Sequence, residues 1–140
     1  MAEGISPALP LRIDPIDGAY GLNKNLKQVA EQGLRMVILT SPGERIMFPQ
    51  FGVGVRSYLF EQNTSSTTSR IRTAIESQVA TYLPYIKIES LTVRSPEVIN
   101  SANPGEVDNT TILIELAYSI PAARITSSLT VPVSLSNTNY

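Results

Sequence analysis

The stretch Thr40-Ser-Pro-Gly-Glu-Arg-Ile-Met-Phe-Pro-Gln-Phe-Gly-Val-Gly-Val-Arg-Ser-Tyr-Leu-Phe60 organises the rest of the chain. Pro42-Gly43 is typical of a tight turn, because proline presets φ and glycine accepts the positive φ that a type II turn requires. Gly52 and Gly54 predict a second reversal, after which residues 55–60 can form a short helix. Several residues between the reversals are too apolar for a solvated loop and predict an ordered connector pressed onto a core: Ile46, Met47, Phe48 and Phe51.

Two amphipathic helices are predicted on either side of this stretch. Apolar residues recur at helical spacing from about Leu22 to Leu39, and again from about Ser66 to Leu83, where Pro84 ends the pattern. Gly33 within the first helix allows the close approach of another element or introduces a kink, and the sequence leaves both readings open.

The remainder predicts strands. Residues 85–94 alternate only in part, and a bulge near Glu89-Ser90 would reconcile the two halves. Residues 110–120 alternate clearly, as expected of a central strand. Residues 124–135 form an edge strand, because Pro132 removes a backbone donor, and three of its residues alternate as a buried set: Leu129, Val131 and Val133. The fold class is therefore α+β, with two main helices on a small mixed or antiparallel sheet of three to four strands.

The chain divides into an extended N-terminal arm (1–20), an α+β domain (21–123) and a C-terminal edge strand with a tail (124–140). Prolines disfavour a helix in the arm, yet the arm is rich in Ile and Leu. It is either a disordered terminus or a segment lying along a partner or back over the domain. We expect the domain to remain folded without residues 124–140.

Composition excludes several classes of function. The 140 residues contain no cysteine and no histidine, which removes disulfides, thiolate nucleophiles and the commonest general base and transition-metal ligand. No apolar run approaches the roughly 20 residues of a membrane span, and no signal peptide is visible. The 11 basic and 12 acidic residues form no basic cluster, so neither nucleic acid nor a membrane is expected as a partner. Charged residues are only 16% of the chain, which favours a protein packed against neighbours.

The candidate chemical sites are weak. Glu44 with Glu61 or Glu89 could form the carboxylate pair of a glycosidase, although a turn cap or an arginine partner is the simpler role for Glu44. Residues 51–54 (Phe-Gly-Val-Gly) lack the full phosphate-binding spacing. Three aspartates could bind calcium but match no EF-hand spacing: Asp14, Asp17 and Asp108. We therefore predict no catalytic, cofactor or metal site.

The predicted edge strand is more informative than these carboxylates. Residues 124–135 carry one arginine and no other charge, so little guards the edge against pairing with a strand of another chain. The alternative is an ordinary edge that a loop covers.

Five segments carry a resemblance to a known family: Asn25-Leu-Lys-Gln-Val-Ala30, Met36-Val-Ile-Leu-Thr40, Ser41-Pro-Gly-Glu-Arg45, Phe48-Pro-Gln-Phe-Gly52 and Leu59-Phe60-Glu61. Over about residues 15–120 the chain resembles the baseplate wedge and sheath-initiator family of contractile phage tails, which has a counterpart in the type VI secretion baseplate. After the second helix, where the family usually has Glu-Pro-Arg and an aliphatic residue, this chain has Leu83-Pro-Tyr-Ile86.

The resemblance implies a non-enzymatic structural protein of the virion tail baseplate, assembled in the bacterial cytoplasm. Its implied partners are other wedge proteins, the tail sheath protein and tube-proximal or hub proteins, with about six copies around the tail. It would join wedge proteins and template the first sheath ring; the alternative is a lysozyme-like, tail-associated cell-wall glycosidase. The residues predicted to serve structure or protein interaction are Pro42, Gly43, Glu44, Arg45, Phe48, Phe51, Gly52, Pro84, Leu129, Val131 and Val133.

Overall fold

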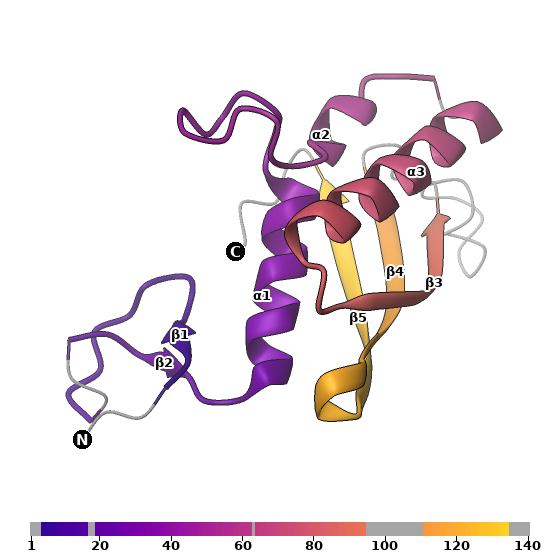
Figure 1. Cartoon of the computed structure of the whole chain (residues 1–140). Helices are drawn as coiled ribbons and strands as arrows, with labels where there is room; N and C mark the ends of the chain where they lie inside the picture. The colour runs from indigo at the N-terminus through magenta and orange to yellow at the C-terminus, as the bar shows by residue number, and fades with distance from the viewer. Residues whose placement is uncertain (1–3, 17–18, 63, 95–110, 135–140) are drawn as a thin grey trace, which may run out of the picture.

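The structure, a computed structural model, describes residues 4–16, 19–62, 64–94 and 111–134 (Figure 1). Asp17 and Asp108, named above, and the last residue of the predicted strand 124–135 lie outside these residues. The elements follow in the order β1 (Ser6–Pro7), β2 (Leu22–Asn23), α1 (Leu26–Leu39), α2 (Val55–Tyr58), α3 (Ser65–Tyr82), β3 (Lys87–Arg94), β4 (Thr111–Ile120), a 3-10 turn (Pro121–Ala123) and β5 (Ile125–Ser134).

The domain has two layers, which confirms the predicted α+β class. β3, β4 and β5 form an antiparallel sheet in that spatial order, with β4 in the centre. The two main helices, α1 and α3, lie on one face of this sheet (Figure 1). The register between β3 and β4 shifts between Ile88 and Ser90, where the sequence predicted a bulge.

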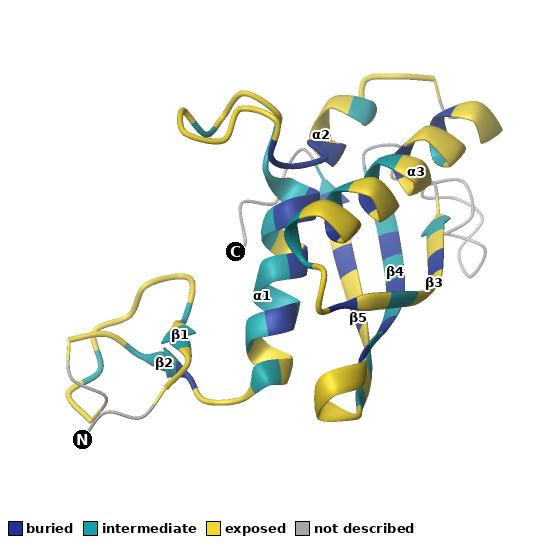
Figure 2. Cartoon of the chain, viewed as in Figure 1, coloured by how far each residue is buried: buried dark blue, intermediate teal, exposed yellow. Residues whose placement is uncertain are grey.

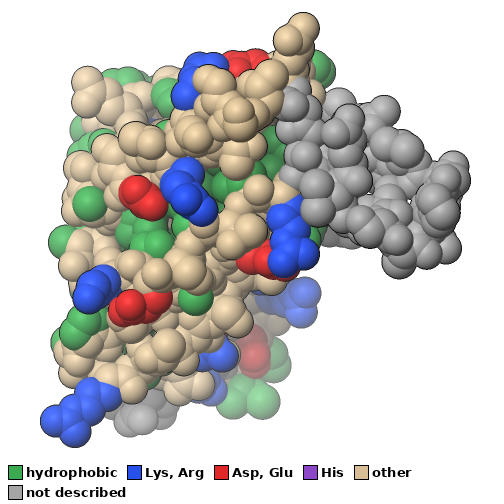
Figure 3. Space-filling view, turned by 90° about the vertical axis from the view of Figure 1, so that its right-hand side faces the viewer, with side chains coloured by type: hydrophobic (Ala, Val, Ile, Leu, Met, Phe, Trp, Pro, Cys, Tyr) green, Lys and Arg blue, Asp and Glu red, His purple; other side chains and the backbone are tan. Residues whose placement is uncertain are grey.

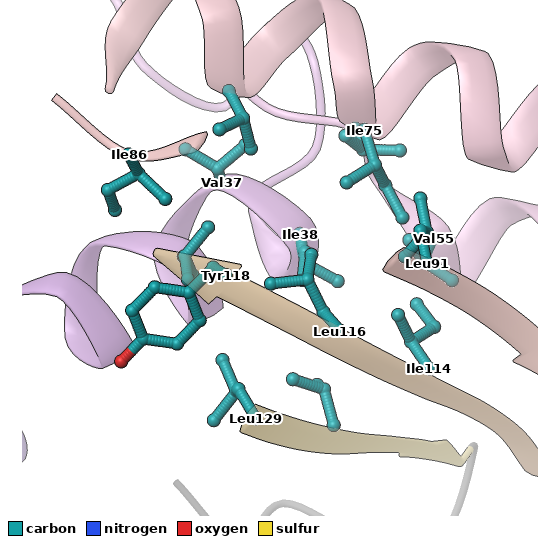
Figure 4. Close-up of a cluster of buried hydrophobic side chains, with 14 of the residues drawn as sticks. Val37, Ile38, Val55, Ile75, Ile86, Leu91, Ile114, Leu116, Tyr118 and Leu129 are labelled. Carbon is teal, nitrogen blue, oxygen red and sulfur yellow. The ribbon is translucent and has the colours of Figure 1, made fainter. Parts of the chain in front are cut away.

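The central strand shows why the sheet has a single apolar face. Along β4 buried and half-buried residues alternate strictly, as the period of two requires. The helix-facing residues of all three strands join α1 and α3 in one core (Figure 4). The core residues of β4 and β5 are Ile112, Ile114, Leu116, Tyr118, Ile120, Leu129, Val131 and Val133.

β5 therefore belongs to the core of the domain. Leu129, Val131 and Val133 are each at most 4% exposed, and β5 pairs with β4 over its whole length. The expectation that the domain folds without residues 124–140 conflicts with this packing, because removing β5 would expose the apolar face of β4. An edge strand leaves one of its two backbone edges unpaired, but the side chains on one of its faces can still be buried in the core.

α1 begins later than the periodicity predicted. Asn25 is its N-cap, and Gln28 Oε1 accepts hydrogen bonds from the backbone N–H groups of Lys24 and Asn25 at 3.2 and 3.4 Å. The preceding Leu22–Asn23 pairs with Ser6–Pro7. At Gly33, an added Cβ would lie 3.2 Å from Leu83 Cδ2, so this glycine serves close packing of the segment after α3.

The N-terminal segment doubles back on itself and forms a small lobe at the start of α1 (Figure 1). Gln32 of α1 anchors it: its Oε1 accepts from the Leu9 N–H at 3.0 Å and from Asn23 Nδ2 at 2.9 Å, while its Nε2 donates to Pro7 O at 3.1 Å. Ile13 and Ile16 remain 85% exposed. The lobe is attached to the domain by polar contacts, and its apolar side chains face solvent.

Tyr118 is a fully buried polar group in the core. Its ring lies among aliphatic side chains and its hydroxyl points toward α1 (Figure 4). The hydroxyl makes no hydrogen bond of good geometry, although Glu31 and Ser127 lie nearby. Burial, reinforced by the charge of Glu31, raises the pKa of Tyr118 above its ordinary value of 10.0.

We predict that Tyr118→Phe leaves the free energy of unfolding at neutral pH within about 1 kcal/mol of wild type, because no strong hydrogen bond is lost. A raised pKa in the folded state means that the unfolded chain ionises first as pH rises, so this tyrosine makes wild type lose stability above pH 10.0. The variant should lose less stability over that range. Urea unfolding followed by circular dichroism at several pH values tests this, and identical alkaline slopes would contradict it.

Candidate protein-interaction site

The connector between α1 and α2 is a closed loop with an inner and an outer part. Its two ends meet where the Gly54 N–H donates to Thr40 O at 2.9 Å, and the Val53 N–H donates to Val37 O at the same distance. Residues 51–55 are all buried, whereas residues 46–50 are all exposed (Figure 2). The inner part thus seals the end of the core, and the outer part leaves the domain.

Three predicted site residues close the outer part. Pro42 and Gly43 occupy a turn in which Gly43 has φ +87°, and the Gly43 N–H donates to Pro49 O at 2.7 Å. Glu44 Oε2 accepts from the Ser41 N–H at 2.9 Å, so its carboxylate caps the turn. The bond between Gly43 and Pro49 therefore joins the two ends of the outer part of the loop.

Arg45 ties the loop to α3. Its guanidinium carbon lies 3.9 Å from the centre of the Phe51 ring, and Phe51 meets Tyr82 edge-on with ring centres 4.9 Å apart. Gln78 of α3 adds two hydrogen bonds where the inner and outer parts meet: its Oε1 accepts from the Gly52 N–H at 2.9 Å, and its Nε2 donates to Gln50 O at 3.0 Å. The loop is therefore held at its base from both helices.

The prediction that the whole connector presses onto the core is wrong in its outer half. Phe51 is 9% exposed and lies in the core, but Ile46, Met47 and Phe48 are 95%, 84% and 60% exposed. The bond from Gly43 to Pro49 closes the loop before these three residues can reach the core. Apolar character indicates that a side chain will be buried somewhere, and it does not reveal whether by its own chain or by another.

Gly52 is required by a close approach of backbone to backbone. It has φ +102°, and an added Cβ would lie 2.1 Å from Thr40 O. Gly43, in contrast, has φ +87° and nothing within 4 Å of an added Cβ. Both glycines thus have a positive φ that would strain a residue with a side chain, and only Gly52 also lacks space for one.

We predict that Gly52→Ala lowers the free energy of unfolding by about 3 kcal/mol or more, because steric overlap with Thr40 adds to the cost of a positive φ. Gly43→Ala is the matched control and should lose only about 1–2 kcal/mol from the backbone strain. Urea denaturation of both variants measures the difference. Equal losses would show that the contact between Gly52 and Thr40 contributes nothing.

The other predicted site residues occupy the sheet and the turn after α3. Pro84 is exposed within a turn that the Ile86 N–H closes by donating to Leu83 O at 2.9 Å. Leu129, Val131 and Val133 face the core, so β5 can offer a partner only its backbone edge and its other face. Among the described residues no strand pairs with this outer edge of β5.

The carboxylates that could have formed a glycosidase pair each have a local partner. Glu44 caps its turn, Glu61 forms an ion pair with Arg70 at 2.8 Å, and Glu89 accepts from the Ser119 hydroxyl at 2.6 Å. Within the described ranges no group of three or more acidic residues is arranged to hold a metal ion. The structure thus gives each of these carboxylates a role in holding the fold.

The side formed by α3 and β3 carries dispersed charge. Acidic and basic side chains lie there singly or side by side, with no broad area of one sign (Figure 3). Two ion pairs are Arg70 with Glu61 at 2.8 Å and Arg94 with Glu115 at 3.0 Å. In the part of the chain that the structure describes, no helix combines the length and apolar character needed to span a bilayer.

Sequence reasoning missed two polar residues that position these surfaces. Gln78 is polar and lies off the apolar stripe of its helix, yet it is half-buried and its side chain makes two hydrogen bonds to the loop. Arg72 donates to the backbone oxygen of Leu91 and so links α3 to β3. Helical periodicity places both side chains beside the apolar stripe and gives no sign of their backbone partners.

The projecting loop and an outer strand that no described strand pairs with are features that suit a domain to contact other proteins. Residues 24–124 match the family described as baseplate wedge protein gp25, so the chain belongs to this family. It is accordingly a structural component of a contractile tail baseplate that associates with other baseplate proteins.

Two solved structures are similar to the chain. One is a Geobacter sulfurreducens protein with the provisional name tail lysozyme: it is 21% identical with a TM-score of 0.65, over 85% of this chain and 99% of that chain. The other belongs to the anti-feeding prophage baseplate, 6-fold symmetrised: it is 20% identical with a TM-score of 0.58, over 94% of this chain and 86% of that chain. Among the curated proteins none matches. At these identities the two structures support the fold.

Proposed function

We propose that this protein is the sheath initiator of its tail: it joins the baseplate wedge and offers β5 as a template for the first sheath ring. The observation that carries the proposal is the contrast between the two outer strands. β3 bears three charged residues and a bulge, both of which protect an edge, whereas β5 bears no charge at all. An unprotected edge is suited to accept a strand from another chain.

Pro132 defines the part of β5 that is available. Within the continuous pairing with β4, a proline fits with its nitrogen on the open side, since it has no N–H to donate. Residues of the same parity, including Ser128 and Thr130, then direct their N–H groups to the open side. The incoming strand would pair before Pro132, along residues 125–131.

The remaining partners follow from the same proposal. The loop, α1 and α3 form the rigid body that docks to other wedge proteins, with further contacts to tube-proximal or hub proteins. The similar structure from a 6-fold symmetrised baseplate supports about six copies around the tail, put together in the bacterial cytoplasm before the particle is complete. The type VI secretion baseplate would hold a protein of the same kind.

We predict that Thr130→Pro blocks sheath assembly. Proline removes the backbone N–H that residue 130 directs to the outer edge of β5, and its ring hinders the approach of a new strand. The fold should persist, since Pro132 is already accommodated two residues further on. Thr130→Val is the matched control, because it retains the N–H. Electron microscopy of purified tails should show baseplates that contain the variant but carry no extended sheath. Full-length sheath on such tails would refute the template.

We further propose that the protein is not an enzyme, despite the lysozyme name of one similar structure. The three candidate glutamates each hold a turn, an arginine or a strand in place. We predict that the purified protein releases no soluble fragments from dye-labelled peptidoglycan, with hen egg-white lysozyme as the positive control. Release that Glu44→Gln or Glu61→Gln abolishes would establish the glycosidase instead.

A further inference from the structure

The outer tip of the loop carries a run of exposed apolar residues. Ile46, Met47 and Phe48 are consecutive and 95%, 84% and 60% exposed. No other three consecutive large apolar residues among those described are exposed. The loop projects from the domain at the end of α1, where no helix or strand of the described residues covers it (Figure 1). Burying an exposed apolar cluster of this kind against another surface lowers the free energy, which favours association.

The tip is held in one shape before any partner arrives. Gly43 and Pro49 close it with a hydrogen bond of 2.7 Å, and the Phe51 N–H donates to Phe48 O at 3.0 Å. Arg45 packs on the ring of Phe51, which in turn contacts Tyr82 of α3, so the end of the loop is held against this helix. Binding therefore costs little conformational entropy, which is the main advantage of a preorganised contact.

The charges around the tip favour a protein over a lipid surface as the partner. Membrane-binding loops combine apolar tips with free basic residues that contact anionic lipids. Here the one basic residue of the loop, Arg45, lies on Phe51, and the one acidic residue, Glu44, caps the turn. Methionine and aromatic residues are, in contrast, enriched at the centres of protein interfaces.

We propose that Ile46, Met47 and Phe48 form a preformed plug that inserts into a concave apolar pocket on a different protein of the baseplate wedge. This proposal rests on the proposed function and names the contact through which the domain joins the wedge. Phe48 is the central anchor, because it is the largest of the three and its backbone oxygen is fixed by Phe51. Ile46 and Met47 surround it and exclude water from the contact.

The first test compares two serine variants in complete tails. The triple variant Ile46→Ser, Met47→Ser and Phe48→Ser should keep the thermal stability of wild type, since the side chains it shortens are exposed. Phe60→Ser is the control, because Phe60 is a 77% exposed aromatic residue outside the tip. With each variant as the only copy in the cell, mass spectrometry counts copies per purified baseplate. We expect at least a tenfold loss for the triple variant and none for the control.

The second test identifies the surface that receives the tip. A photoreactive benzoylphenylalanine at position 48 in assembled baseplates should form an adduct with one other wedge protein, and the same group at position 60 should not give this adduct. Wild-type occupancy of the triple variant would overturn the proposal. So would an adduct with a second copy of this chain, or tip-dependent binding to vesicles of phosphatidylglycerol and phosphatidylcholine.

The outcomes separate this inference from the proposed function. If wild-type protein is absent from purified baseplates, the assembly role itself is refuted. If wild type and the triple variant are equally present, only the plug is refuted. If the triple variant is lost while Thr130→Pro is retained without sheath, the tip and β5 serve two different partners.

Discussion

The contact of Gly52 with Thr40 is the constraint on which the rest of the domain depends. Here the chain returns from the loop so closely to the end of α1 that a Cβ on residue 52 would lie 2.1 Å from the Thr40 oxygen. This return places residues 51–55 in the core and starts α2 beside α1. It also presents the Gly52 N–H to Gln78, which brings in α3. One backbone contact therefore joins three helices and determines the direction in which the outer loop projects.

Sequence periodicity was sufficient to predict the fold class, because most of the apolar residues in the helices and strands pack into the domain's own core. The alternation along 110–120 identified β4 and its buried face, and Pro132 identified β5 as an outer strand. The partial alternation of 85–94 identified the bulge of β3. Periodicity did not predict the start of α1 correctly. The helix begins after the cap formed by Gln28, and Leu22 pairs instead within the N-terminal lobe. That boundary depends on a pairing with Ser6–Pro7 that no local pattern encodes.

The candidate site could be predicted only in part, for a physical reason. Glycine and proline mark where the backbone must reverse, so the turn at Pro42-Gly43 and the tight return at Gly52 were evident. The burial of Phe51 and the exposure of Phe48, three residues apart, depend on which side of the closing hydrogen bond each residue lies. Gln78 is a further case, because an amide that bonds to backbone has no periodic signature.

The tip and β5 illustrate two different ways in which a domain can be incomplete on its own. At the tip, apolar side chains lack a cover, so association there would be driven by the release of water and would tolerate salt. Along the outer edge of β5, no strand of the described residues pairs with the backbone, so association there would be directional and would specify register. The first contact needs a rigid base, which Arg45 and Gln78 supply; the second needs a strand fixed by its buried face, which Leu129 and Val131 supply. Because both supports belong to one core, a change that loosens the core should weaken both contacts together, whereas a change at the tip should leave the strand unaffected.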